Sequence, residues 1–233
     1  MNKPESYTIN AQIAGGMWLL AIVAGIVGVG FLGNYQDIET NLALFSQNEI
    51  NIQIASLLTL VMCFSTALIA IFLYPVLKKY NESMALSSIG FRLLETVCFT
   101  IGVLGLLLLL VVSKDYVNSG SPADTSYQLL THSFLRLNDI SSSIAGFAFN
   151  AGAFMYCYIF FRTKLVPRGL GALGIIAVTL GILDSFLSFF GFYTGFDPIS
   201  VVLSLPTLLF ELIIAFWLII KGFNQDVLLS YEN

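Results

Sequence analysis

Long apolar blocks alternate with short polar segments along the whole chain. Each block has at least about 20 mostly apolar residues, the length that an α-helix needs to cross a bilayer. The blocks predict six transmembrane helices at about residues 11–32, 52–77, 85–113, 140–161, 169–193 and 201–220. We therefore expect an all-α, polytopic membrane protein in which residues 1–233 form a single transmembrane domain.

The composition indicates that the main partner of the protein is the lipid bilayer. Of its 233 residues, 57% are hydrophobic and 10% are charged, whereas roughly a quarter are charged in soluble domains. The net charge is −4 and no basic block is present, which argues against a nucleic-acid partner. Cys63, Cys98 and Cys157 lie inside apolar blocks without metal-ligand spacing, so we expect small packing residues and no metal site.

The charges between the blocks predict the orientation of the chain. Basic residues follow the second, fourth and sixth blocks, at Lys78, Lys79, Arg162, Lys164, Arg168 and Lys221. The alternate connections are mainly acidic. Because Lys and Arg near the ends of spans stay in the cytoplasm, we expect both termini to be cytoplasmic.

The third block carries Arg92 and Glu95 within its apolar first half. Ionisable residues in a membrane helix are costly, so they usually face the bundle interior and have a partner. Residues three apart share one helical face, and this face continues through Ser88, Phe99 and Gly102.

Polar or small residues also form a face on three other blocks. The residues at helical spacing are Ser56, Thr59, Cys63 and Thr66, with Tyr74 further along, in the second block; Asp139, Ser142, Gly146, Asn150, Ala153 and Cys157 in the fourth; and Ser200, Ser204, Thr207 and Glu211 in the sixth. The fifth block carries Asp184.

Helical rise places several of these residues at similar depths. Counted from the cytoplasmic block ends at 1.5 Å per residue, Arg92 lies about 10 Å deep, Glu95 and Glu211 about 15 Å and Asn150 about 18 Å. Arg92 is then the counter-ion of Glu211, of Glu95 or of both. One carboxyl is left over, so either it is protonated or a cation or ligand donor joins the site. Asp184 is expected to meet the Ser and Asn faces.

Two functions of different classes fit this layer. In the first, the polar faces form an outward-opening cavity above the charged residues, and the protein binds or transports a small solute or an ion. The expected ligand residues are Arg92, Glu95, Asn150, Glu211, Asp184 and Tyr74. In the second, the protein is structural or regulatory, and the pairing of Arg92 with Glu211 or Glu95 only clamps helices together.

Enzymatic functions fit the sequence poorly, and we expect neither enzymatic activity nor a cofactor. His132 is the single histidine and lies outside the predicted spans. A Ser or Cys nucleophile therefore has no histidine base inside the bundle, zinc has no histidine pair, and haem has one candidate ligand at most. The connection that holds His132 is amphipathic; it either lies on the membrane surface or extends the fourth span outward.

Three stretches resemble a known family: LYPVLKKYNESMALSSIGFRLLETV (73–97), FRTKLVPRGLGALG (161–174) and LPTLLFELIIAFWLIIKGF (205–223). They are similar to the bacterial six-span membrane family called domain of unknown function 4386. The resemblance implies an integral protein of the bacterial inner (plasma) membrane with no established activity, and it suggests Arg92, Glu95 and Glu211 as family features. Small residues in the first span, Ala21, Gly25 and Gly28, would allow a homo-oligomer.

Overall fold

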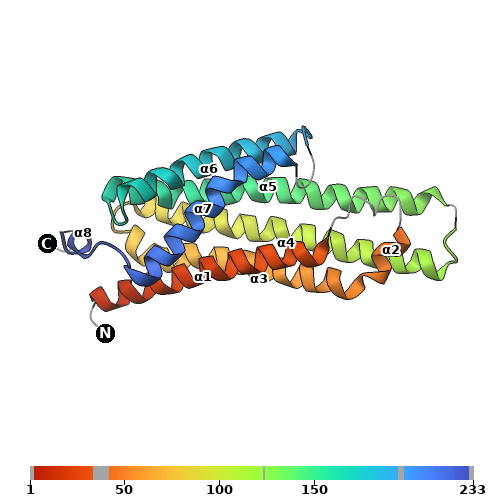
Figure 1. Cartoon of the computed structure of the whole chain (residues 1–233), viewed down its shortest axis with the longest axis horizontal. Helices are drawn as coiled ribbons and strands as arrows, with labels where there is room; N and C mark the ends of the chain where they lie inside the picture. The colour runs from red at the N-terminus through yellow and green to blue at the C-terminus, as the bar shows by residue number, and fades with distance from the viewer. Residues whose placement is uncertain (1–2, 34–41, 123, 194–196, 231–233) are drawn as a thin grey trace.

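The structure, a computed structural model, describes residues 3–33, 42–122, 124–193 and 197–230. These residues form helices and no strands (Figure 1). The helices are α1 (Lys3–Leu32), α2 (Leu42–Gln47), α3 (Glu49–Leu77), α4 (Glu82–Asn118), α5 (Thr125–Thr163), α6 (Arg168–Phe189), α7 (Pro198–Ile220) and α8 (Gln225–Ser230).

Within the described ranges, six helices are long and apolar enough to span a membrane: α1, α3, α4, α5, α6 and α7. Each overlaps one of the six blocks found in the sequence, although α4 and α5 extend well beyond the predicted bounds of 85–113 and 140–161. For the residues that the structure describes, the prediction of an all-α fold with six helices able to span a membrane is therefore confirmed.

The six long helices close into a ring. Each packs against the next along the chain, from α1 to α3, α4, α5, α6 and α7, and α7 returns to α1. In Figure 1, α7 crosses the others obliquely. At its C-terminal end it approaches α1, where a methyl group on Gly15 would lie 2.7 Å from the carbonyl oxygen of Ala215. Nearer its N-terminus it contacts α6, and the Thr207 hydroxyl donates to the Ala177 carbonyl at 3.3 Å.

Side chains in the connections define where the helices begin and end. Asn81, Asp124 and Asp197 each accept a hydrogen bond from a backbone N–H in the first turn of the following helix, as N-cap residues do. The bond from the Ser126 N–H holds the pKa of the exposed Asp124 carboxyl below its usual range. Lys164 ends α5 in the left-handed conformation, with φ of 60°.

Helices α4 and α5 are longer than the membrane is thick. With 37 and 39 residues, they measure roughly 55 and 58 Å at 1.5 Å per residue, against a hydrocarbon core of about 30 Å. Figure 1 shows their connected ends projecting beyond the other helices. Of the two arrangements expected for the segment around His132, the structure has the extension of the fourth span.

A small second core supports this projecting hairpin. It consists of Phe45, Ile52, Leu109, Leu110 and Leu135, contributed by α2, α3, α4 and α5. The Ser113 hydroxyl donates to the Leu42 carbonyl at 2.6 Å, and Lys114 pairs with Glu49 at 2.5 Å. From α5, Leu135 and the neighbouring Phe134 pack into this core, which favours continuation of the amphipathic segment as helix over a position flat on the membrane.

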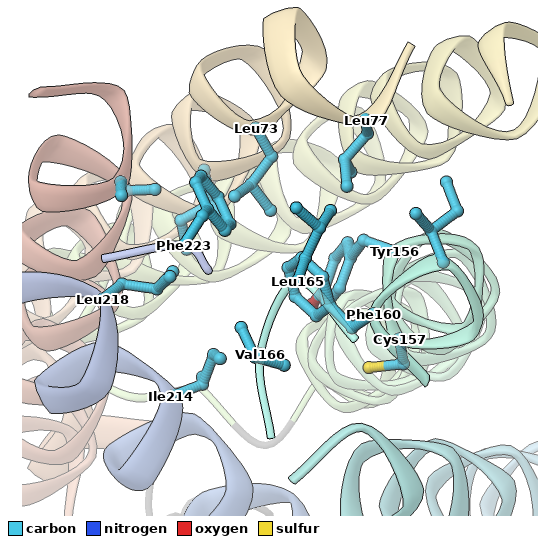
Figure 2. Close-up of a cluster of buried hydrophobic side chains, with 14 of the residues drawn as sticks. Leu73, Leu77, Tyr156, Cys157, Phe160, Leu165, Val166, Ile214, Leu218 and Phe223 are labelled. Carbon is cyan, nitrogen blue, oxygen red and sulfur yellow. The ribbon is translucent and has the colours of Figure 1, made fainter. Parts of the chain in front are cut away.

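The larger core lies at the opposite end of the molecule, near both termini (Figure 1). Figure 2 shows part of it, including Leu73 and Leu77 of α3 and, next to Leu165, Tyr156 and Phe160 of α5. Trp18 of α1 is fully buried there and meets Tyr156 edge to face, with ring centroids 5.7 Å apart.

The small residues of α1 are used for packing inside the chain. A methyl group on Gly25 would lie 3.1 Å from the Met62 sulfur, and one on Gly28 would lie 3.2 Å from Cβ of Leu58. Ala21 is buried as well. This face joins α1 to α3, and the homo-oligomer stays a prediction.

Candidate functional site

The charged residues of α4 are the centre of a buried polar network. Arg92 has no exposed surface, and its Nη1 donates to Glu95 Oε2 at 2.9 Å. Its Nη2 donates to the Tyr156 hydroxyl of α5 at 2.5 Å. The Thr66 hydroxyl of α3 donates to Glu95 Oε1 at 3.0 Å. The network therefore links three neighbouring helices through one ion pair, in a place where both charges are removed from solvent.

Of the two glutamates expected beside Arg92, Glu95 is the one in contact. Glu211 of α7 interacts electrostatically with both Arg92 and Glu95, but within the described residues it makes no ion-pair contact with the guanidinium. The guanidinium carbon of Arg92 lies over the Phe149 ring, 4.1 Å from the ring centre, which is favourable for a cation. Both terminal nitrogens of Arg92 are thus bonded within α4 and α5.

A cavity of about 430 Å³ lies inside the ring, with lining residues from all six long helices. Four of the six ligand residues proposed from the sequence line it: Glu95, Asn150, Asp184 and Glu211. Arg92 is bonded to Glu95 but does not itself line the cavity. The helices thus gather acidic and amide side chains from α4, α5, α6 and α7 around one space.

Tyr74, the remaining proposed ligand residue, lies elsewhere. Its hydroxyl donates to Glu82 at 3.4 Å, and the Lys78 ammonium group lies 5.3 Å from the centre of its ring. Both contacts are at the turn between α3 and α4. The structure does not bring Tyr74 to the cavity.

Asn150 presents an unpaired acceptor at the cavity. Its Nδ2 donates to the Gly146 carbonyl at 2.8 Å, whereas its buried Oδ1 has no hydrogen-bond partner. Gly181 of α6 provides the room for this amide, because a methyl group there would overlap it. Buried polar groups are nearly always hydrogen-bonded, so an orphaned acceptor identifies a candidate ligand contact.

Further unpaired polar atoms lie around the same layer. Arg92 Nε and Ser88 Oγ are both buried without a hydrogen-bond partner. The indole of Trp18 approaches the Glu211 carboxyl, but its Nε1 makes no hydrogen bond of normal geometry. Unpaired donors and acceptors from α1, α4 and α5 therefore surround the charged residues.

A second, more polar cavity adjoins the first between α5 and α6. It has a volume of about 360 Å³ and shares Gly146, Asp184 and Ser185 with the central cavity. Asp184 lies at the junction and accepts a hydrogen bond from the Tyr193 hydroxyl at 2.5 Å. Since Asp184 was expected to meet the polar face of the fourth span, its position beside Gly146 agrees with that expectation.

Sequence reasoning missed the partners of the charged residues on α1 and α5. Tyr156, Phe149 and Trp18 were not among the proposed site residues, yet they contact or approach Arg92 and Glu211. Tyr156 lies three residues after Ala153, and Phe149 three after Gly146, so both border the polar face of the fourth span. This helical spacing was the signal in the sequence that could have identified Tyr156 and Phe149 as site residues.

Comparison with known protein families identifies the family of this chain. The family described as domain of unknown function (DUF4386) matches residues 13–222, from the first turns of α1 to just beyond α7. The chain belongs to the DUF4386 family. Searches of the curated proteins and of the solved structures found no match.

Membership of DUF4386 confirms the resemblance found in the sequence. The first DUF4386-like stretch, 73–97, carries the Arg92–Glu95 pair, and the third, 205–223, carries Glu211. In the structure of this DUF4386 chain, these two stretches contribute Glu95 of α4 and Glu211 of α7 to the lining of the central cavity.

Proposed function

We propose that the protein binds a small cationic solute or a cation in the central cavity, as a binding or transport protein, with Glu211 as the principal ligand. One observation carries the proposal: Glu211 lines the cavity while Arg92 is bonded to Glu95 and Tyr156. None of the described residues that line the cavity is basic. An acidic group in a membrane interior needs a partner, and a bound cation would provide one.

The rest of the lining favours an organic cation. Asp184 supplies a second carboxyl and Asn150 Oδ1 an unpaired acceptor for an N–H donor. Phe99 and Phe149 add aromatic surface, which attracts ammonium groups. A small protonated primary or secondary amine would fit these groups and the volume of about 430 Å³.

Replacing Glu211 by glutamine tests the proposal. We expect Glu211→Gln to weaken binding at least about tenfold, a change equivalent to roughly 1.4 kcal/mol, because the amide keeps the shape but removes the charge. The melting temperature in detergent should change little. The measurement is a thermal-shift screen of the purified protein against inorganic cations, amino acids and amines, followed by isothermal titration of the compounds that bind.

Glu82→Gln is the matched control, since Glu82 is exposed in the first turn of α4, away from the cavity. It should leave binding unchanged. If no cation stabilises the wild type, or if both variants bind it equally, the proposal is wrong.

The structural alternative has its own support. The bonds from Thr66 to Glu95 and from Arg92 to Tyr156 tie α3, α4 and α5 together. In a purely structural protein, Glu211→Gln would break none of these bonds, and no solute would raise the melting temperature. The same experiment therefore separates the two functions.

We also propose a bacterial inner-membrane location with both termini in the cytoplasm. The support is that Lys78, Lys164, Arg168 and Lys221 belong to the turns and helix ends on the side of the bundle that holds both termini (Figure 1). A C-terminal green fluorescent protein fusion should therefore fluoresce, and a C-terminal alkaline phosphatase fusion should be inactive. The reverse pattern would contradict this orientation.

A further inference from the structure

Two segments far apart in the sequence meet at the end of the bundle that holds both termini. They are the connection between α5 and α6 and the chain that follows α7. The Asn224 N–H donates to the Leu165 carbonyl at 2.9 Å. Leu165, Val166 and Phe223 are buried in the larger core (Figure 2). These contacts hold the two segments together as fixed walls.

The two segments line a third cavity, of about 520 Å³, which is open to the surface and which the central site does not use. Three basic residues line it: Lys164, Arg168 and Lys221. Each is exposed, and within the described part of the chain none forms an ion pair with a carboxylate. Helix α6 begins at this cavity without a side-chain cap, so the positive end of its dipole adds to the three charges. The cavity is therefore suited to an anion.

The surroundings favour a lipid over a soluble anion. Trp217 of α7 also lines the cavity, and tryptophan is typical of the level of lipid headgroups. Directly along α7, Ile213, Phe216 and Ile220 are 48%, 52% and 71% exposed. They form an apolar strip that leads from the basic cavity toward the membrane interior, where acyl chains would lie.

We propose that this cavity binds the phosphate headgroup of an anionic phospholipid, with the acyl chains along the outer face of α7. Lys164, Arg168 and Lys221 would contact the phosphate, and basic sites at helix ends are a known mode of anionic lipid binding. The Leu-Val-Pro-Arg and Lys-Gly-Phe motifs, which helped to identify the family, build the two walls. This proposal is independent of the central cavity and of what binds there.

The test is lipid binding to the purified protein in a neutral detergent, measured by native mass spectrometry. Phosphatidylglycerol and phosphatidylcholine with identical acyl chains are titrated separately. We expect phosphatidylglycerol to bind more tightly to the wild type. Basic residues near a membrane surface are each worth about 1 kcal/mol toward anionic lipid, or about fivefold in affinity. The Lys164→Gln/Arg168→Gln/Lys221→Gln variant should therefore bind phosphatidylglycerol at least about 25-fold more weakly and lose the preference.

Two further variants make the result specific. Lys78→Gln/Arg162→Gln removes two charges from the same end but outside the cavity, and it should weaken binding much less than the triple variant does. Lys164→Arg/Lys221→Arg keeps the charge and should retain the preference. Because the three residues are exposed, all variants should fold, which the melting temperature checks.

Three outcomes would overturn the proposal. The wild type could bind both lipids equally, the triple variant could keep its preference, or the control variant could lose as much affinity as the triple variant. Competition with inorganic phosphate is a separate measurement. If millimolar phosphate displaces phosphatidylglycerol completely, the cavity is a site for free anions and the lipid assignment is wrong.

Discussion

Replacing Arg92 by methionine should destabilise the protein by about 3–5 kcal/mol, the usual cost of leaving one partner of a buried ion pair alone. Methionine preserves much of the side-chain volume but leaves Glu95 buried with only the Thr66 hydroxyl as a donor. It also removes the bond to Tyr156, which connects α4 to α5. The measurement is denaturant or thermal unfolding of the purified protein in detergent.

The double variant Arg92→Met/Glu95→Gln provides the control for charge. Since it removes both members of the pair, no unpaired charge remains, and at least half of the lost stability should return. If the double variant is as unstable as Arg92→Met, the loss comes from packing around Phe149 and Tyr156 and not from the ion pair.

Adding one methyl group at Gly15 should open the ring between α1 and α7. The new Cβ would lie 2.7 Å from the Ala215 carbonyl oxygen and 2.8 Å from Cγ1 of Ile219. The carbonyl belongs to the helix backbone, so α7 must move as a unit. We expect Gly15→Ala to cost about 1–3 kcal/mol, as overpacking does, in the same unfolding measurement.

The adjacent residue gives a nearly ideal comparison. A methyl group on Gly16 would meet nothing within 4 Å, and alanine favours a helix over glycine by up to about 1 kcal/mol. Gly16→Ala should therefore leave stability unchanged or raise it slightly. Equal losses at Gly15 and Gly16 would contradict the close contact between α1 and α7.

The sequence predicted the helices well because membrane spans carry a strong local signal. About 20 apolar residues in a row have few alternatives in a bilayer, and short connections make neighbours antiparallel. The pairing of Arg92 with Glu95 was among the predicted alternatives, because residues three apart share a face. The extent of α5 was left open, since packing against α4 decides it.

The partners across helices could not be read from the sequence with the same certainty. Which spans are neighbours depends on the closure of the ring, and helical periodicity within one span contains no information about it. The depth in the membrane was a usable signal for Tyr156. This residue is six positions before Arg162, so it lies roughly 9 Å from the cytoplasmic end of its span, and the depth of Arg92 is about 10 Å. Only the three-dimensional structure shows that Tyr156, and not Glu211, bonds directly to Arg92.

The projecting hairpin of α4 and α5 also has a practical consequence for imaging. At 25.5 kDa, the protein is small for electron cryomicroscopy, and most of it would be hidden in a detergent micelle. Two continuous helices leave the bundle and end at the turn around Gly120. A rigid helical protein fused in frame at this turn would stand clear of the micelle in a fixed orientation and serve as an alignment marker.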